Sequence, residues 1–110
     1  QLMLNKGEID GERLFPAEVA KRIAKGGDPS KFSGFPTIPG GSYTSQWWVF
    51  HNKHGAYAAR GVHGQTIYVD PTAEMVLVRF ASFPTAQNGR IDPTSLPAYQ
   101  ALAEYLMAKD

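Results

Sequence analysis

The sequence contains no cysteine, no long hydrophobic run and no excess of charge of one sign. The absence of cysteine excludes a disulfide framework, a thiolate metal site and a cysteine nucleophile. No apolar run approaches the roughly 20 residues that a membrane-spanning helix needs. The formal net charge is +1, without a lysine- or arginine-rich block. We therefore expect no nucleic-acid partner and no membrane partner, and a soluble protein whose compartment, cytoplasmic or periplasmic, stays open.

The chain is long enough for one hydrophobic core. It has 110 residues, of which 43% are hydrophobic, and these values predict one domain or a piece of one. The opening "QLMLNKGEIDG" has no initiator methionine, no signal-peptide layout and no helix N-cap before Leu2. A trimmed or disordered start is one interpretation. We favour the other, in which residues 2–6 end a helix and residues 1–110 form a single partial domain of a larger protein.

Two helices are predicted, with a loop after the first. Pro16 suits the first position of a helix that ends at Gly26, and its apolar face consists of Val19, Ala20, Ile23 and Ala24. Residues 28–42 are rich in proline and glycine and indicate a long loop. The last helix can be capped by Asp92 or Thr94. Its apolar stripe can lie on a sheet and contains Leu96, Tyr99, Leu102, Ala103, Leu106 and Met107.

Between the helices the sequence predicts strands. The runs 43–50, 56–62, 65–69 and 75–82 have strand composition, and the last is nearly continuously apolar, as in a central strand. Their short connections imply antiparallel pairing. The predicted class is α+β, with an antiparallel sheet of about four strands and an N-terminal and a C-terminal helix packed on it.

The usual motifs of acyl-transfer enzymes are absent from the sequence. There is no Ser-x-x-Lys, no Gly-x-Ser-x-Gly and no Tyr-x-Asn. The carboxylates show no paired spacing of the glycosidase type. The chain therefore has no self-contained acylation apparatus and no catalytic nucleophile of its own, and we expect no cofactor and no metal.

The sequence has three histidines, and each is a candidate site residue. His51 and His54 bracket a predicted turn, and we interpret them as exposed polar residues because zinc sites need further ligands at matched spacing. His63 lies between Gly61 and Gly64, which suggest a bulge or a close approach to the backbone. It is either a hydrogen-bonded histidine at a strand end or a residue facing a ligand or a helix of the larger protein.

Two adjacent tryptophans lie in the predicted strand 43–50. Trp47 and Trp48 point to opposite faces of one strand. A core position for both is the simpler interpretation. The alternative is that one of them borders a substrate pocket, since tryptophan combines a large apolar area with one hydrogen-bond donor.

The order of these features resembles the C-terminal portion of serine hydrolases of the β-lactamase and penicillin-binding-protein superfamily, and most closely the esterase and 6-aminohexanoate-dimer hydrolase type. The resemblance covers essentially the whole chain. Its most specific segment is "ARGVHGQTIYVDP", followed by "LMLNKGEIDGERLFP". It implies a partial β-lactamase/transpeptidase-like fold, with the catalytic Ser, Lys and Tyr upstream and the missing N-terminal part of the protein as a partner.

The resemblance also implies site residues. It places Ala59, Arg60 and Gly61 on the family's Lys-Thr-Gly strand, and the N–H of the next residue, Val62, becomes a candidate oxyanion-hole donor. A different registration places His63 and Gly64 on a His-x-Gly variant. Because Ala59 replaces the usual lysine, an ester or amide substrate that needs no carboxylate recognition is expected. The candidate pocket residues are His63, Gln65, Trp47 and Trp48.

Small residues suit such a strand. Acyl transfer passes through a tetrahedral oxyanion, and one preorganised backbone donor is worth about 3 kcal/mol. Ala58, Ala59 and Gly61 keep the strand thin where a nucleophile would approach, and His63 and Gln65 could hydrogen-bond the pocket or fix the loop. The alternative function is a non-catalytic binding or interaction module of a degenerate hydrolase relative.

Overall fold

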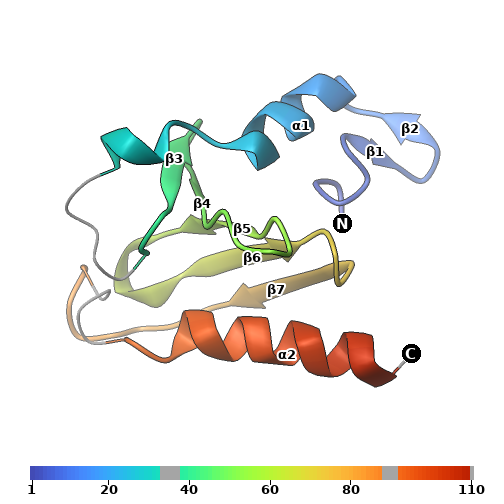
Figure 1. The fold of residues 1–110 in the computed structure, drawn as a ribbon. Coiled ribbons are helices and arrows are strands. Elements are labelled where there is room, and N and C mark those ends of the chain that lie inside the picture. Colours follow the sequence, from blue (N-terminus) through green and yellow to red (C-terminus); the bar gives the residue numbers. More distant parts are fainter. Residues whose placement is uncertain (33–37, 88–91, 110) are drawn as a thin grey trace.

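A five-stranded sheet occupies the middle of the chain (Figure 1). The structure is a computed structural model that describes residues 1–32, 38–87 and 92–109. The strands follow one another in chain order, each antiparallel to the last: β3 (Ser42–Thr44), β4 (Trp47–Val49), β5 (Tyr57–Arg60), β6 (Thr66–Asp70) and β7 (Met75–Arg79). With the two α-helices of the described residues, this arrangement confirms the α+β class.

The predicted strand 43–50 is wrong as a single element. It is a hairpin of β3 and β4, in which Tyr43 pairs with Trp48. The turn residues Ser45 and Gln46 have φ values of 49° and 69°. A tight hairpin turn of this kind needs left-handed backbone, and the sequence has neither the glycine nor the asparagine that usually signals it. The sheet therefore has one strand more than expected.

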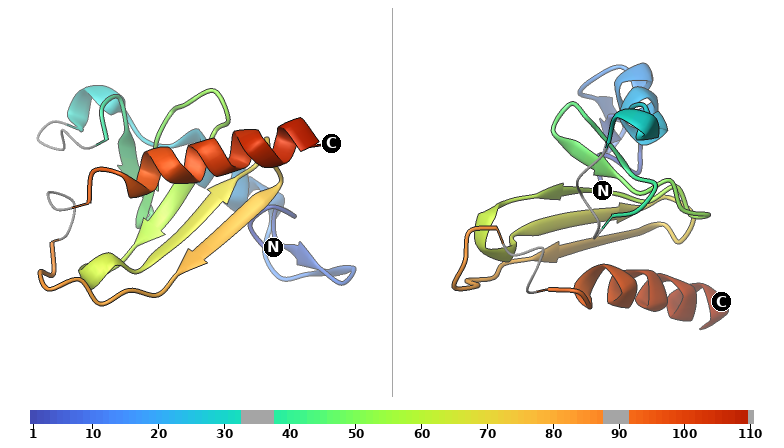
Figure 2. Two further views of the ribbon diagram at one scale, coloured as in Figure 1. Left: turned by 90° about the horizontal axis from the view of Figure 1, so that it is seen from below. Right: turned by 60° about the vertical axis from the view of Figure 1, so that its left-hand side comes forward.

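The sheet is sandwiched between the helices α1 (Ala17–Lys25) and α2 (Ser95–Lys109), one on each face (Figures 1 and 2). On the first face, Ile23 of α1 packs into a cluster with Val49, Tyr57 and Val69. The side chains of a strand alternate between faces. The next residue of β5, Ala58, accordingly belongs to the second cluster, which also contains Ala56, Tyr68, Met75, Tyr99 and Ala103.

Helix α2 covers the sheet with only part of its predicted stripe. Tyr99 and Ala103 are buried, whereas Leu102, Leu106 and Met107 are each about 40% exposed. The predicted face of α1 is correct, since Ala20 and Ile23 are buried. Of the two proposed caps of α2, the Asp92 side chain accepts the Ser95 backbone N–H at 3.2 Å.

The N-terminal residues form turns and a small hairpin. β1 (Glu8–Ile9) and β2 (Glu12–Arg13) pair around Asp10-Gly11, as the Asp-Gly signal predicts. Residues 2–6 are turns, so the prediction that they end a helix is wrong. The backbone turns back at once: Gly7, with φ of 95°, donates its N–H to the Leu2 carbonyl.

The Pro/Gly-rich segment 28–42 contains one short element. Asp28 caps the 3₁₀ turn η1 (Pro29–Lys31) by accepting the Ser30 N–H at 3.0 Å. Residues 33–37 of this predicted loop lie outside the described residues. Within the described part of the chain, no helix has the length and apolar character needed to cross a membrane.

Candidate functional site

The segment that follows β5 presents an unused backbone donor. β5 ends at Arg60, and after Gly61 the chain enters the 3₁₀ turn η2 (Val62–Gly64). The Gly61 N–H donates to the Gln65 carbonyl at 2.9 Å. The N–H at the first position of a helical turn has no partner within the turn. No hydrogen bond of the described residues uses the Val62 N–H, and this residue is 61% exposed.

His63 fixes η2 to the segment after β7. Its N–H donates to the Ala86 carbonyl and its own carbonyl accepts the Phe83 N–H, both at 3.0 Å. Its Nδ1 lies 2.7 Å from the Phe83 carbonyl oxygen. Since a carbonyl only accepts, Nδ1 carries the proton. The His63 backbone has φ of 57°, and these three bonds hold that left-handed conformation in place.

Gln65 extends the pairing of β6 and β7 past their ends. Its side-chain amide donates to the Ala81 carbonyl, and its Oε1 accepts the Ala81 N–H at 3.2 Å. The Gln65 side-chain amide thus makes the two hydrogen bonds that a paired backbone residue would make with Ala81. Of the two roles considered for His63 and Gln65, fixing the loop is the one these contacts support.

Gly64 and Arg79 also hold η2 against the end of β7 and the segment that follows it. Gly64 has φ of 93°, and a Cβ there would lie 2.8 Å from the Phe83 ring and 3.1 Å from the Ala81 Cβ. The close neighbour at Gly64 is therefore residues 81–83 of this chain. The interpretation of a ligand or another helix at this glycine is wrong. The Arg79 Nε donates to the Gly64 carbonyl at 2.8 Å.

Arg79 also connects η2 to the start of α2 through side-chain contacts. Its Nη1 lies 3.2 Å from an Asp92 oxygen and 2.6 Å from the Ser95 hydroxyl. Its guanidinium lies over the rings of Phe83 and Tyr99, 5.2 Å and 5.7 Å from their centroids. Burial raises the pKa of Asp92, but hydrogen bonds from Ser95 and Arg79 outweigh it and leave that pKa below the ordinary value.

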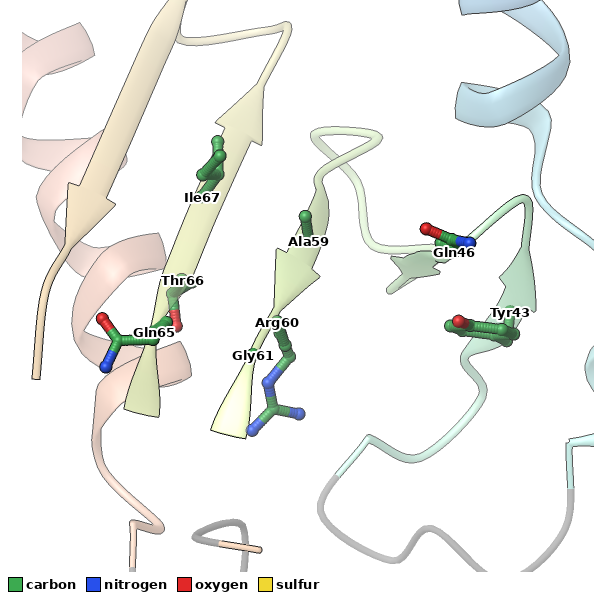
Figure 3. Close-up of a pocket in the computed structure, with 8 residues that line it drawn as sticks. All are labelled: Tyr43, Gln46, Ala59, Arg60, Gly61, Gln65, Thr66 and Ile67. Atoms are coloured by element: carbon green, nitrogen blue, oxygen red, sulfur yellow. The ribbon is translucent and has the colours of Figure 1, made fainter. Parts of the chain in front are cut away.

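A hollow of about 430 Å³ opens beside the end of β5 (Figure 3). It is lined by residues of the β3–β4 hairpin, of β5 and β6 and of the positions next to these two strands. The lining residues are Tyr43, Gln46, Ala59, Arg60, Gly61, Gln65, Thr66 and Ile67. The predicted strand residues Ala59, Arg60 and Gly61 are therefore part of its wall. Val62 follows directly after this wall in the chain.

The two tryptophans lie on opposite faces, as predicted, and both are half-buried. Trp47 packs edge-on against Tyr57, with ring centroids 5.3 Å apart, and adjoins the cluster under α1. Trp48 is not part of the lining of the hollow but contacts two residues that are: its ring is 4.8 Å from that of Tyr43 and 5.8 Å from the Arg60 guanidinium carbon. Of the four candidate pocket residues, Gln65 lines the hollow, whereas His63, Trp47 and Trp48 do not belong to its lining.

His51 and His54 lie in two separate environments. His51 is exposed, and its Nε2 lies 2.7 Å from the Ser42 hydroxyl, which also accepts the Gly27 N–H. His54 is buried, so its interpretation as an exposed turn residue is wrong. Its Nδ1 lies 2.7 Å from an Asp70 oxygen. A buried polar side chain needs such a partner, and Asp70 is distant in sequence.

No group of three or more potential metal ligands occurs among the described residues. Sequence reasoning missed Arg79 and identified Asp92 only as a possible helix cap, not as the partner of Arg79. A charged residue inside the apolar run 75–82 was the only available signal for Arg79. Its partners are separated from it by more than ten residues.

Comparisons with known proteins agree with this architecture. No family model matches the chain. The chain is 33% identical over 87 residues to a 6-aminohexanoate-dimer hydrolase of Paenarthrobacter ureafaciens, an alignment that covers 76% of this chain and 22% of that protein. A solved structure described as a putative 6-aminohexanoate-dimer hydrolase from Bacillus anthracis matches with a TM-score of 0.76 and 34% identity.

That structural match covers 97% of this chain and 27% of the other, so the chain spans about a quarter of the length of these relatives. The identity exceeds what fold similarity alone requires, and the sequence and structure comparisons point to proteins of the same name. The resemblance inferred from the sequence is confirmed: the chain is a relative of the β-lactamase-like serine hydrolases named 6-aminohexanoate-dimer hydrolase and corresponds to a C-terminal portion of them.

Proposed function

We propose that this chain is the C-terminal segment of a serine hydrolase that cleaves an ester or amide through an acyl-enzyme, with the nucleophilic serine, its lysine and the tyrosine upstream. In this proposal the chain supplies one wall of the active site. The substrate is a small ester or amide, and the missing N-terminal part of the same protein is the partner that completes the site.

The observation that carries the proposal is the Val62 N–H. Val62 is 61% exposed, no described residue accepts the hydrogen of its N–H, and the residue directly follows the wall of the hollow. A tetrahedral intermediate needs a donor that is already oriented and does not have to leave another acceptor. Val62 meets both conditions.

The surroundings support preorganisation of that donor. The residues on its C-terminal side are held by the His63 bonds to Phe83 and Ala86 and by the Arg79 bond to the Gly64 carbonyl. On its N-terminal side, the Gly61 N–H donates a hydrogen bond to the Gln65 carbonyl. A donor fixed in this way loses little conformational freedom during the reaction.

The donor can be removed without changing the local backbone. Gly61 has φ of −106° and ψ of 171°, a conformation that a residue preceding proline adopts, and proline is tolerated at the first position of a helical turn. We expect Val62→Pro in the longer protein to lower kcat by about 100-fold, since this is the usual effect of losing one oxyanion donor. Val62→Ala keeps the N–H and should stay within about threefold of wild type.

The measurement is the hydrolysis of a 4-nitrophenyl ester, with circular dichroism to check folding. Equal activity of folded Val62→Pro and Val62→Ala would reject Val62 as the donor. The mechanism itself is tested by labelling the longer protein with a serine-directed fluorophosphonate. No labelling together with no ester cleavage would reject the mechanism.

The second candidate function is a binding or interaction module of a degenerate relative. The hollow beside Tyr43, Arg60 and Trp48 would serve such a role without any chemistry. A protein that binds a ligand there and never becomes labelled would have this function.

A further inference from the structure

We propose that Arg79 is a positioning residue for the oxyanion donor. It holds the η2 turn so that the Val62 N–H keeps its direction, and it sets kcat without touching the substrate. This role rests on the proposed hydrolase function. Arg79 does not belong to the lining of the hollow, and it connects to the donor through the Gly64 carbonyl.

The backbone of η2 depends on contacts from outside the turn. His63 and Gly64, the two residues after Val62, have φ values of 57° and 93°, both in the left-handed region. A non-glycine residue keeps such a conformation only where the surrounding structure fixes it. Within the turn, the Gln65 N–H lies 3.5 Å from the Val62 carbonyl oxygen, which is long for a hydrogen bond. The direction of the Val62 N–H is therefore set by the neighbours of η2.

Arg79 makes the strongest side-chain contact to the end of this turn. Its Nε donates to the Gly64 carbonyl at 2.8 Å, a length typical of a charged donor. The other side-chain donor to that carbonyl among the described residues is the Thr66 hydroxyl, at 3.4 Å. The Phe83 ring packs on Gly64 and lies 5.2 Å from the same guanidinium. Arg79 thus holds Gly64 by a hydrogen bond and through the ring beside it.

The guanidinium is itself fixed on its other side. Its Nη1 lies 3.2 Å from an Asp92 oxygen and 2.6 Å from the Ser95 hydroxyl. The Arg79 side chain is only 21% exposed, so water competes little for these contacts. A planar guanidinium can donate to Gly64 and to Asp92 at the same time, whereas the ammonium group of a lysine is a single point of charge. The start of α2 therefore determines where Arg79 places η2.

A small displacement matters at an oxyanion donor. The donor has to lie about 2.7–3.1 Å from the oxygen of the tetrahedral intermediate. A displacement of about 1 Å can lower the rate by about 100-fold. Since the negative charge develops only in the transition state, a misplaced donor lowers kcat and leaves KM nearly unchanged. A loss of stability alone would instead lower the number of folded molecules.

The test is a double-mutant cycle in the longer protein with Arg79→Met and Val62→Pro. Hydrolysis of 4-nitrophenyl butyrate is measured per serine that a fluorophosphonate titrates, so that unfolded molecules do not count. We expect Arg79→Met to lower kcat about tenfold with KM within about twofold, and to have no further effect in the Val62→Pro background. Arg22→Met removes the same charge from an exposed position of α1 and should match wild type.

An equal loss in both backgrounds would overturn the proposal, because Arg79 would then act by a route other than Val62. A loss confined to KM would overturn it as well. If Arg79→Met does not fold, Arg79→Lys takes its place in the cycle. It keeps the charge beside Asp92 but lacks the fork, and we expect kcat to fall about threefold, again only where the Val62 N–H is present. Wild-type kcat in Arg79→Lys would contradict the role of the fork.

Hydrogen exchange measured by NMR tests the hold on η2 without any chemistry. The N–H groups of Gly61 and His63 both donate to backbone carbonyls and report on the turn. Their exchange should become about tenfold faster in Arg79→Met and stay at the wild-type rate in Arg22→Met. Faster exchange without fluorophosphonate labelling would support the hold of Arg79 on η2 and reject the hydrolase. Labelling with unchanged exchange would overturn the role of Arg79 and leave the hydrolase standing.

Discussion

Asp70 is enclosed at the end of β6, and each of its carboxylate oxygens has a partner. One oxygen lies 2.7 Å from His54 Nδ1, and the other accepts the Ala73 N–H at 2.9 Å. The Thr72 hydroxyl donates to the His54 carbonyl at 2.9 Å. The β4–β5 and β6–β7 connections are therefore joined by a small buried polar cluster.

Removing Asp70 should destabilise the fold. Asp70→Ala leaves His54 and the Ala73 N–H without partners in a dry environment, which costs about 2 kcal/mol of the free energy of unfolding. Urea denaturation followed by tryptophan fluorescence measures this loss. Asp70→Asn keeps two acceptor lone pairs and the shape and should lose less. If His54→Ala costs the same in the presence and absence of Asp70, the two side chains are not coupled.

At this scale the sequence predicted residue types well and partners poorly. The unusual small residues of "YAARGVHGQ" were visible as a constraint on the backbone. The identity of the neighbour at Gly64 was not, because Phe83 is 19 positions further along the chain. A contact between distant residues leaves no periodic signal in one sequence.

At the scale of elements, Arg79 connects three of them. Through its contacts with Gly64, Asp92 and Ser95, the end of β7 holds both η2 and the start of α2. The position of the proposed Val62 donor thus depends on a side chain at the opposite edge of the sheet from β3.

This connection should be sensitive to acid. Since the pKa of Asp92 is lower in the folded state than in the unfolded state, its ionised form stabilises the fold above the unfolded pKa of about 3.9. The stabilisation is lost as the pH falls through the folded pKa. We expect Asp92→Asn to reduce stability by about 1 kcal/mol at pH 7 and to differ little from wild type in strong acid.

Urea denaturation at pH values from 7 down to strong acid measures the difference in stability between Asp92→Asn and wild type. Glu12→Gln removes an equal charge from an exposed position of β2 and should be close to neutral at every pH. A constant difference between Asp92→Asn and wild type down to strong acid would contradict the assigned role of the Asp92 carboxylate.

At the scale of the whole molecule, several large apolar side chains remain exposed, and two groups of them lie on the sheet and on α2. Ile67 and Val78 lie on the sheet face that α1 covers only in part, 43% and 54% exposed. Leu102, Leu106 and Met107 lie on α2. Under the proposed function, the upstream part of the protein covers such surfaces, since monomeric proteins rarely leave large apolar patches in water.

We therefore expect the 110-residue chain alone to melt at a lower temperature and less cooperatively than the longer protein, and to bind more of the dye 8-anilinonaphthalene-1-sulfonate. Calorimetry and dye fluorescence measure the two effects. A sharp transition of the chain alone at the temperature of the longer protein would favour the independent binding module.

The sequence by itself determined the α+β class, the antiparallel order, the buried face of α1, the opposite directions of Trp47 and Trp48 and the resemblance to serine hydrolases. These properties depend on local periodicity, turn residues and short motifs, which neighbouring positions encode.

Only the tertiary structure decided that residues 43–50 form two strands, that His54 is a buried partner of Asp70 and that residues 81–86 fix the segment after "YAARG". It also decided that Arg60 lies against Trp48 without an ion pair among the described residues. The physical reason is common to all of them: hydrogen bonds and charge pairs between distant segments depend on where the folded backbone brings each side chain.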